Sequence, residues 1–158
     1  MTQSYSRLQI VLHWLTAVLT AVQFLSDDPV GEAFRQMMRG IEVTSGPGVA
    51  VHVYGGIVIL ALVVWRLVLR LVRGAPQPPE EESERLKLVA QLTHWALYAA
   101  MVLIPVTGLT AWFGGIGAFG EVHEVLGNFL LFLVGLHVLG AMYHQFILGT
   151  NLIARMRP

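Results

Sequence analysis

Apolar residues along the chain gather into four long stretches that are separated by polar segments. No Asp, Glu, Lys or Arg occurs in residues 8–25, 49–65, 88–113 and 125–148. A helix of about 20 apolar residues crosses the hydrocarbon core of a bilayer. The pattern therefore predicts an all-α protein, an integral membrane four-helix bundle in one domain over residues 1–158. The expected spans cover about 8–25, 49–71, 88–113 and 124–148.

The connections between the spans carry signals of their own. In the first, Asp28-Pro29 predicts the start of a short helix, because proline suits the first helical position. A helix lying on the membrane surface is predicted by an apolar stripe at i, i+3, i+4 and i+7, made of Phe34, Met37, Met38 and Ile41. Gly46-Pro47-Gly48 should then break the chain. We expect residues 74–87, which are proline-rich and then acidic, to be solvated, and residues 114–120 to form a tight glycine-rich turn.

Composition removes several classes of protein. The chain is 55% hydrophobic and 13% charged, with a mean hydropathy of +0.64, whereas soluble domains carry about 25% charged residues. A net charge of zero gives no basis for binding nucleic acid. The chain has no cysteine, which excludes disulfides, thiolate metal sites, iron–sulfur clusters and covalent attachment of c-type haem. Histidine is left as the obvious soft ligand.

Basic residues are distributed unevenly between the two sides of the predicted bundle. Four spans place both termini on one side, together with eight of the ten Lys and Arg residues, while Arg35 and Arg39 lie on the other. Because basic loops stay in the cytoplasm, we expect both termini to be cytoplasmic. The N-terminal segment has one Arg and no small-residue cleavage site, so the first span is expected to be retained.

The last span carries two histidines on one face. His123 and His137 are 14 residues apart, which leaves them about 40° from alignment and about 21 Å apart along a helix axis. Ionisable groups inside a bilayer are costly and indicate a functional site. Two coordinating groups stacked on one helix face suggest two metal centres stacked across the membrane.

Depth sorts the six histidines into two layers. His52 and His123 form an outer pair on two helices, as a haem held between helices requires. On the cytoplasmic side, His13 can pair with His137 or with His144. Depth slightly favours His144, whereas the small residues one turn beyond His137 leave room for a flat macrocycle. We take His13–His137 as the inner pair.

Further polar residues fall in the cytoplasmic layer. His94 and His144 are left either as residues that support the ligands or line a substrate site, or as hydrogen-bonded packing residues. Arg66 and Arg70 are interpreted first as topology anchors, and also as candidate partners of haem propionates.

Several motifs recur in one order along the chain. They are Tyr5-Ser-Arg-Leu-Gln-Ile-Val-Leu-His13-Trp14, His52 before an apolar run that ends in Val-Val-Trp-Arg66-Leu-Val-Leu-Arg70-Leu, His94 with Ile104-Pro105-Val-Thr-Gly108, and His123-Glu124 with Gly135-Leu-His137. Together they resemble the bacterial cytochrome b561 family over nearly the whole chain.

The resemblance implies a multi-pass protein of the bacterial inner membrane. It implies two non-covalent b haems whose iron ligands are His13, His52, His123 and His137. It also implies electron exchange with ubiquinone. One type of member oxidises superoxide at the periplasmic face and reduces ubiquinone, and related haem subunits of hydrogenases and formate dehydrogenases relay electrons from a docked partner to quinone.

A quinone site needs proton donors at membrane depth. His144 and His94 are the candidate catalytic residues, and Arg66 and Arg7 beside them are candidate cofactor-binding residues.

Three functions follow as hypotheses. The first is a di-haem superoxide:ubiquinone oxidoreductase. The second is a haem b subunit that relays electrons between quinone and a docked redox partner protein. The third is a haem-free membrane protein whose histidines bind zinc or carry protons. Two histidine ligands leave no open position on iron, which favours outer-sphere electron transfer.

Overall fold

Helices dominate the residues that the structure describes, which are 4–43, 46–78 and 82–157 of this computed structural model, and no strand occurs among them. The helices are α1 (Arg7–Leu25), α2 (Asp27–Met38), α3 (Pro47–Arg73), α4 (Glu84–Gly114) and α5 (Gly117–Phe146), followed by the short 3₁₀ helix η1 (Leu152–Met156). Four of them, α1, α3, α4 and α5, are long and apolar enough to cross a membrane. The prediction of an all-α chain with four spans is confirmed.

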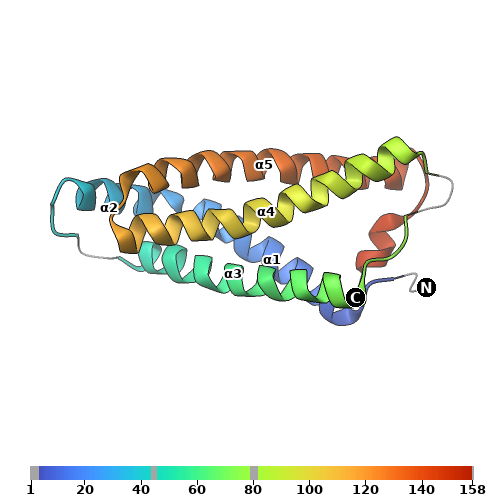
Figure 1. The fold of residues 1–158 in the computed structure, drawn as a ribbon, viewed down its shortest axis with the longest axis horizontal. Coiled ribbons are helices and arrows are strands. Elements are labelled where there is room, and N and C mark those ends of the chain that lie inside the picture. Colours follow the sequence, from blue (N-terminus) through green and yellow to red (C-terminus); the bar gives the residue numbers. More distant parts are fainter. Residues whose placement is uncertain (1–3, 44–45, 79–81, 158) are drawn as a thin grey trace.

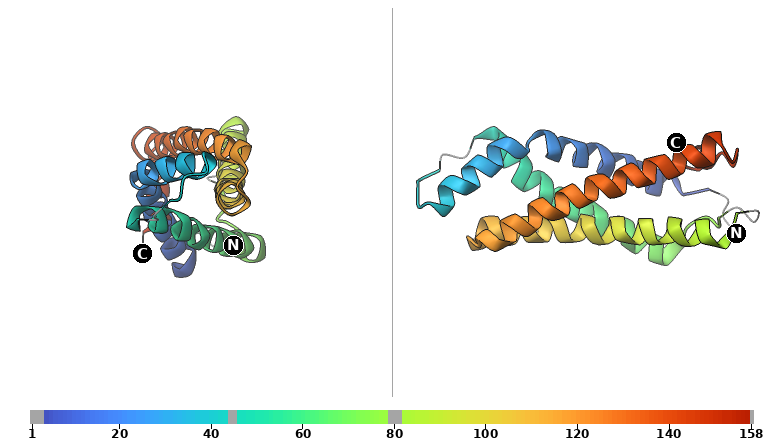
Figure 2. Two further views of the ribbon diagram at one scale, coloured as in Figure 1. Left: turned by 90° about the vertical axis from the view of Figure 1, so that its left-hand side faces the viewer. Right: turned by 90° about the horizontal axis from the view of Figure 1, so that it is seen from above.

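The four long helices lie side by side along the long axis of the molecule (Figure 1). α4 packs along α5, and α3 contacts both α1 and α4. Seen end-on, these helices occupy the corners of a square (Figure 2). Both termini lie at one end, which we call the terminal end, and α2 lies at the opposite end, which we call the α2 end (Figure 1).

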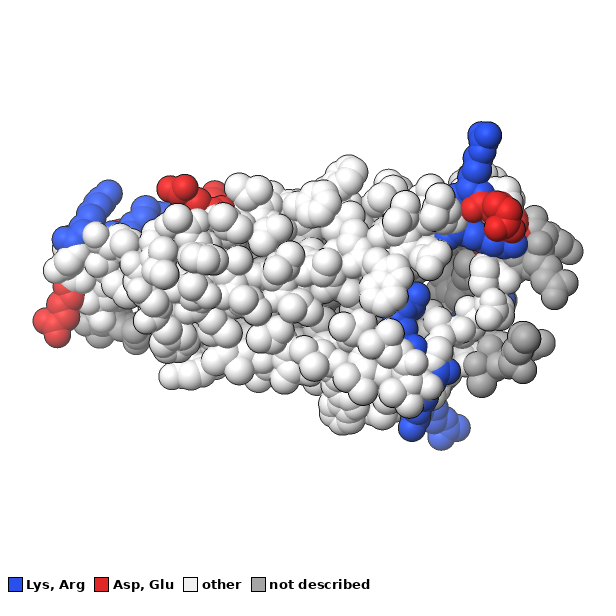
Figure 3. Space-filling view, in the orientation of Figure 1, with Lys and Arg blue, Asp and Glu red and all other residues white. Residues whose placement is uncertain are grey.

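The surface between the two ends is apolar. Figure 3 shows Lys, Arg, Asp and Glu side chains gathered near both ends of the long axis, with an uncharged band between them. Large apolar side chains along the spans are exposed, as at Leu71 and Phe132. Exposing this much apolar surface to water would be energetically unfavourable. The band is therefore expected to lie in contact with lipid.

The helix starts follow from local sequence. Ser6 caps α1 in a capping box with Gln9, and the side chain of Ser83 caps α4 by accepting from the Leu86 N–H. The break expected at residues 46–48 coincides with the start of α3. Pro47 is the first residue of that helix, a position that proline favours.

The short helix predicted in the first connection is present as α2, although it ends at Met38 and leaves Ile41 outside; its position on a membrane surface stays a prediction. α4 continues through Pro105.

The fourth span begins earlier than expected. Only residues 115 and 116 separate α4 from α5, so the glycine-rich turn predicted for 114–120 is wrong in extent. Gly120, within α5, serves packing: a Cβ there would lie 2.6 Å from Cε1 of Phe34. Close approach of α2 explains Gly120 better than turn formation does.

The connection between α3 and α4 is less solvated than its charges predict. Among its described residues, Glu82 has a side chain that is only 3% exposed and lies against α5. The backbone of this connection is also tied to the terminal end, because Arg155 donates to the Gln77 carbonyl at 2.7 Å and Gln9 donates to the Gly74 carbonyl at 3.3 Å. The expectation of a wholly solvated linker is therefore wrong for Glu82.

Candidate functional site

The histidines of the four long helices meet at two levels. Near the α2 end, the ring centroids of His52 on α3 and His123 on α5 are 6.0 Å apart. Near the terminal end, the rings of His13 on α1 and His94 on α4 lie 6.3 Å and 5.2 Å from the ring of His137 on α5. We call the first group the α2 layer and the second the terminal layer. Both expected pairs, His52–His123 and His13–His137, are brought together.

The ring of His123 packs against α4 at Ile104 and Gly108. Its Nδ1 lies 2.8 Å from the carbonyl oxygen of Ile104, which accepts the ring proton. A Cβ on Gly108 would lie 2.8 Å from both Nδ1 and Cε1 of His123. Only glycine lets the imidazole approach α4 this closely. With Nδ1 occupied, Nε2 is the nitrogen left to act as a ligand.

The other histidine of the α2 layer lies against an amide. With its nitrogen towards α3, Gln23 lies 3.2 Å from Nδ1 of His52 and donates to the His52 carbonyl at 3.0 Å. In that orientation its oxygen accepts from the Gly56 N–H at 3.3 Å. Rotating the amide would present its oxygen to a protonated Nδ1. Gln23 can therefore orient His52. The only sign of this role in the sequence is that Gln23 is a polar residue inside an apolar span.

The terminal layer contains a cation. Nη2 of Arg66 lies 2.9 Å from Nδ1 of His13. The Arg66 guanidinium carbon also lies 5.7 Å from the ring centroid of Tyr98, and Arg70 lies at the same distance from the rings of Trp95 and Tyr98. Among the described side chains, no carboxylate comes within ion-pair distance of either arginine.

His94 is placed beside the pair rather than in it. Its Nδ1 donates to the Ala90 carbonyl at 2.6 Å within α4. Its ring packs edge-on against His137. This position fits a residue that supports the layer.

His144 lies apart from His13, in a separate buried cluster. It is 8% exposed, its Nε2 lies 3.1 Å from Oε1 of Glu82, and its Nδ1 lies 3.2 Å from the Thr150 hydroxyl. The sequence did not point to Glu82 or Thr150, because both lie in connections whose approach to α5 is set by tertiary structure. Arg7, at the start of α1, is exposed.

Apolar side chains separate the two layers. A buried cluster is formed by Ala100, Leu130 and Leu133, with Phe24, Ala96, Leu97, Met101 and Ile104 packed against it. α5 runs through this cluster from His123 to His137. The two levels are therefore separate sites within one bundle.

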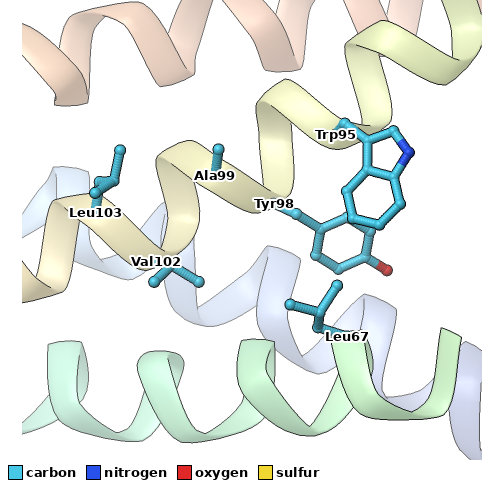
Figure 4. A pocket seen from close by; sticks show the side chains of 6 residues that line it. All are labelled: Leu67, Trp95, Tyr98, Ala99, Val102 and Leu103. Atoms are coloured by element: carbon cyan, nitrogen blue, oxygen red, sulfur yellow. The ribbon is translucent and has the colours of Figure 1, made fainter. Parts of the chain in front are cut away.

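A groove opens on the outer surface between α3 and α4. It has a volume of about 370 Å³ and is lined by Leu67, Trp95, Tyr98, Ala99, Val102 and Leu103 (Figure 4). Its wall is almost entirely apolar. Trp95 and Tyr98 are the residues that Arg70 contacts, so the groove adjoins the cationic side of the terminal layer.

Comparison with known proteins identifies the family of this chain. The model of the prokaryotic cytochrome b561 family matches residues 4–158. The chain belongs to that family. It is therefore a membrane haemoprotein, and the resemblance found in the sequence is confirmed.

Individual relatives of this cytochrome b561 family member match along their full length. Cytochrome b562 of Cereibacter sphaeroides is 32% identical over 161 residues, which cover 100% of this chain and 99% of that protein. A probable superoxide oxidase CybB of Yersinia pestis is 28% identical, covering 100% of this chain and 98% of its own. Cytochrome b561 homolog 1 of Escherichia coli K12 is 25% identical, and the match covers 98% of this chain and 97% of that protein.

The paired histidines fit the b haem that a cytochrome b implies. Metal–imidazole bonds of about 2 Å, as on zinc, and ring radii of about 1.1 Å put two rings on opposite sides of one metal ion with centroids about 6 Å apart. The 6.0 Å and 6.3 Å pairs match this spacing. A Cβ on Gly56 or Gly140, each one turn beyond a histidine, would meet nothing within 4 Å.

The donor set also suits haem better than a bare metal ion. Within the described part of the chain, no group of three or more His, Cys, Asp or Glu residues converges as a metal site. Structural zinc takes four protein ligands, whereas a bound haem would supply most of the iron's ligands itself and would need only two histidines from the protein.

Proposed function

We propose that this cytochrome b561 family member binds two b haems and passes electrons through the membrane to ubiquinone, with superoxide as the electron donor. The observation that carries the proposal is the pair of histidine levels, in which two imidazole rings lie 6.3 Å or 6.0 Å apart, linked by the single helix α5. Bound haem supplies the one-electron redox chemistry. The protein supplies the ligands, the dry space between them and the proton donors.

The ligand assignment follows from the distances. His52 and His123 would hold iron in the α2 layer, and His13 and His137 would hold iron in the terminal layer. His94 approaches His137 more closely than opposed ligands would, and its Nδ1 is engaged with its own helix. His144 is engaged with Glu82 and Thr150, so it is left for another role.

The charge distribution supports cytoplasmic termini. Eight of the ten basic residues belong to the terminal end or to its connection, and Arg35 and Arg39 belong to the α2 end. The α2 layer would then face the periplasm, and the terminal layer would lie near the cytoplasmic surface of the bacterial inner membrane.

Superoxide would donate electrons at the α2 end. The relative from Yersinia pestis carries the name of a superoxide oxidase. The overall reaction takes one electron from each of two superoxide anions, releases two oxygen molecules, and adds two electrons and two protons to one ubiquinone.

Positive charge for attracting superoxide is limited at this end. Arg35 is paired with Glu32 at 3.0 Å, and hydrogen bonds from Gln36 and Arg35 hold the pKa of Glu32 below its ordinary value. Glu32 is therefore anionic at neutral pH and offsets Arg35. Arg39, which directly follows α2, is left as the main cation at the α2 end for steering.

Ubiquinone would be reduced beside the terminal layer. The apolar groove on α3 and α4 offers space for an isoprenoid tail, and its lining residue Tyr98 contacts Arg66. Arg7 begins α1 at the same end of the bundle.

Protons would reach ubiquinone through the buried cluster on α5. The imidazole of His144 and the carboxylate of Glu82, 3.1 Å apart, can hold and pass a proton between the cytoplasmic connection and the bundle. In this arrangement His144 relays protons, and His94 lies beside the ring pair, 5.2 Å from the ring of His137.

A second candidate function is that of a haem b subunit that relays electrons between quinone and a docked redox partner protein. α2 favours it, because this helix presents Met38 and an exposed Arg35–Glu32 pair at the surface beside the α2 layer. Such a mixed apolar and charged surface suits a transient protein contact.

Purified protein in liposomes with ubiquinone separates the candidates. A superoxide-generating enzyme is added outside, and ubiquinol is measured by its absorbance. We expect ubiquinol formation that requires the haem-loaded protein and stops when superoxide dismutase is added. Ubiquinol formation no faster than in protein-free liposomes, from protein that carries both haems, would leave the relay function as the better proposal.

A further inference from the structure

The two histidine layers differ in the groups that face the Nδ1 nitrogens. In the α2 layer, His123 donates to the neutral carbonyl oxygen of Ile104, and His52 lies against the neutral amide of Gln23. In the terminal layer, His13 faces the guanidinium of Arg66 at 2.9 Å. The terminal layer therefore has a permanent positive charge beside one ligand, whereas His123 of the α2 layer donates to a neutral acceptor.

Arg66 is held in place independently of His13. It projects from the last third of α3, it is only partly exposed, and its guanidinium lies over the ring of Tyr98. The described side chains supply no carboxylate to neutralise it or Arg70. When Nε2 of His13 binds a metal, Nδ1 takes the ring proton and no longer accepts from Arg66. The charge of Arg66 stays in the layer even though that hydrogen bond is lost.

A fixed charge next to an iron ligand changes the reduction potential. Oxidised haem iron carries one more positive charge than reduced iron, so a nearby cation disfavours the oxidised form and raises the potential. A histidine that donates its Nδ1 proton to a carbonyl becomes a more basic ligand, which favours the oxidised form and lowers the potential. The neighbours of the ligands are therefore expected to raise the reduction potential in the terminal layer and to lower it in the α2 layer.

We propose that Arg66 raises the reduction potential at the terminal layer above that at the α2 layer, so that electrons entering at the α2 end run downhill towards the terminal end. This inference rests on the two-haem arrangement proposed above. It gives the bundle a preferred direction of electron flow. In this proposal Arg66 acts on the reduction potential through its charge and does not ligate iron.

The test is a spectroelectrochemical titration of the purified, haem-loaded protein. Wild type should show two one-electron components, and His123→Ala should leave only the higher one. Arg66→Gln should lower the higher component by at least tenfold in its equilibrium constant, which is 59 mV for one electron, without moving the lower component. Arg66→Lys, which keeps the charge, should retain most of the potential.

Two further variants keep the test decisive. Arg73→Gln removes an exposed cation at the end of the same helix and should move neither component. Arg70→Gln, one turn beyond Arg66, should lower the same component by less, and it serves if Arg66→Gln loses haem.

The inference and the proposed function fail in different ways. The inference is overturned if both components stay in place in Arg66→Gln and in Arg70→Gln, if the lower component moves instead, or if His123→Ala leaves the lower component. A single component in wild-type protein, with one haem per chain, would overturn the two-haem proposal itself.

Discussion

Nδ1 of His123 donates to the carbonyl oxygen of Ile104 across the interface of α5 and α4. The contact depends on Gly108, one turn further along α4, where a Cβ would come within 2.8 Å of the ring. The motif Ile104-Pro105-Val-Thr-Gly108 therefore has a physical role: it forms the seat for a histidine on another helix.

Gly108→Ala should disturb the α2 layer alone. The added methyl group forces the ring of His123 away from the Ile104 carbonyl, and lost support of a ligand typically costs about 10–100-fold in affinity. We expect faster transfer of one haem to apomyoglobin, with the second haem retained. Gly135→Ala is the matched control, because its Cβ would meet nothing within 4 Å. Equal haem loss in both variants would mean that the seat does not hold His123.

Two b haems should be bound without covalent links. Each layer offers one pair of imidazoles with ring centroids 6.0 Å or 6.3 Å apart, and the chain has no cysteine for attachment. Acid–acetone should extract all of the haem, and the pyridine haemochrome spectrum should give two haems per polypeptide. Haem that stays with the protein after extraction would contradict the proposed binding mode.

Histidine variants should sort by layer. His52→Ala should remove the haem of the α2 layer and leave the other, whereas His13→Ala and His137→Ala should do the reverse. His144→Ala should keep both haems, because that ring is engaged with Glu82. Haem quantification with low-temperature spectra distinguishes the two losses. If His144→Ala lost a haem while His137→Ala kept both, the pairing of His13 would have to be reassigned.

Quinone reduction should depend on the buried cluster at α5. His144→Ala should slow the oxidation of reduced haem by a soluble ubiquinone analogue by roughly 10²-fold, the usual cost of a lost general acid. Glu82→Gln should act in the same direction, and His94→Ala should act more weakly. Stopped-flow reoxidation measures these rates.

Glu84→Gln is the control for these variants, because its carboxylate is 89% exposed and pairs with Lys87. Wild-type rates in all three test variants would place proton delivery elsewhere in the bundle.

Much of this arrangement could be predicted because helix geometry is regular. The 14-residue spacing of His123 and His137 placed them on one face at two depths before any contact was known. Small residues beside His137 favoured it over His144 as the partner of His13, and the rings of His13 and His137 lie 6.3 Å apart; their role as a ligand pair stays a prediction.

Contacts between helices could not be predicted in the same way. Gln23, Glu82 and Gly108 act through neighbours on other helices, and a single sequence gives no rotation of one helix against another. The start of α5 was misjudged for a similar reason, because Gly120 packs against Phe34 and not in a turn. Charge alone suggested a solvated Glu82, whereas His144 provides a buried partner.

The apolar cluster of Ala100, Leu130 and Leu133 has an electrical consequence. Its side chains carry no group that can move a proton, so an electron passing between the layers crosses this zone alone. The crossing covers about 21 Å of a hydrocarbon core roughly 30 Å thick. Moving one charge across the whole membrane costs roughly 2.3 kcal/mol per 100 mV. In the proposed orientation, with the termini in the cytoplasm, electrons would move inward against a negative interior, so a membrane potential should slow electron transfer and an uncoupler should restore its rate.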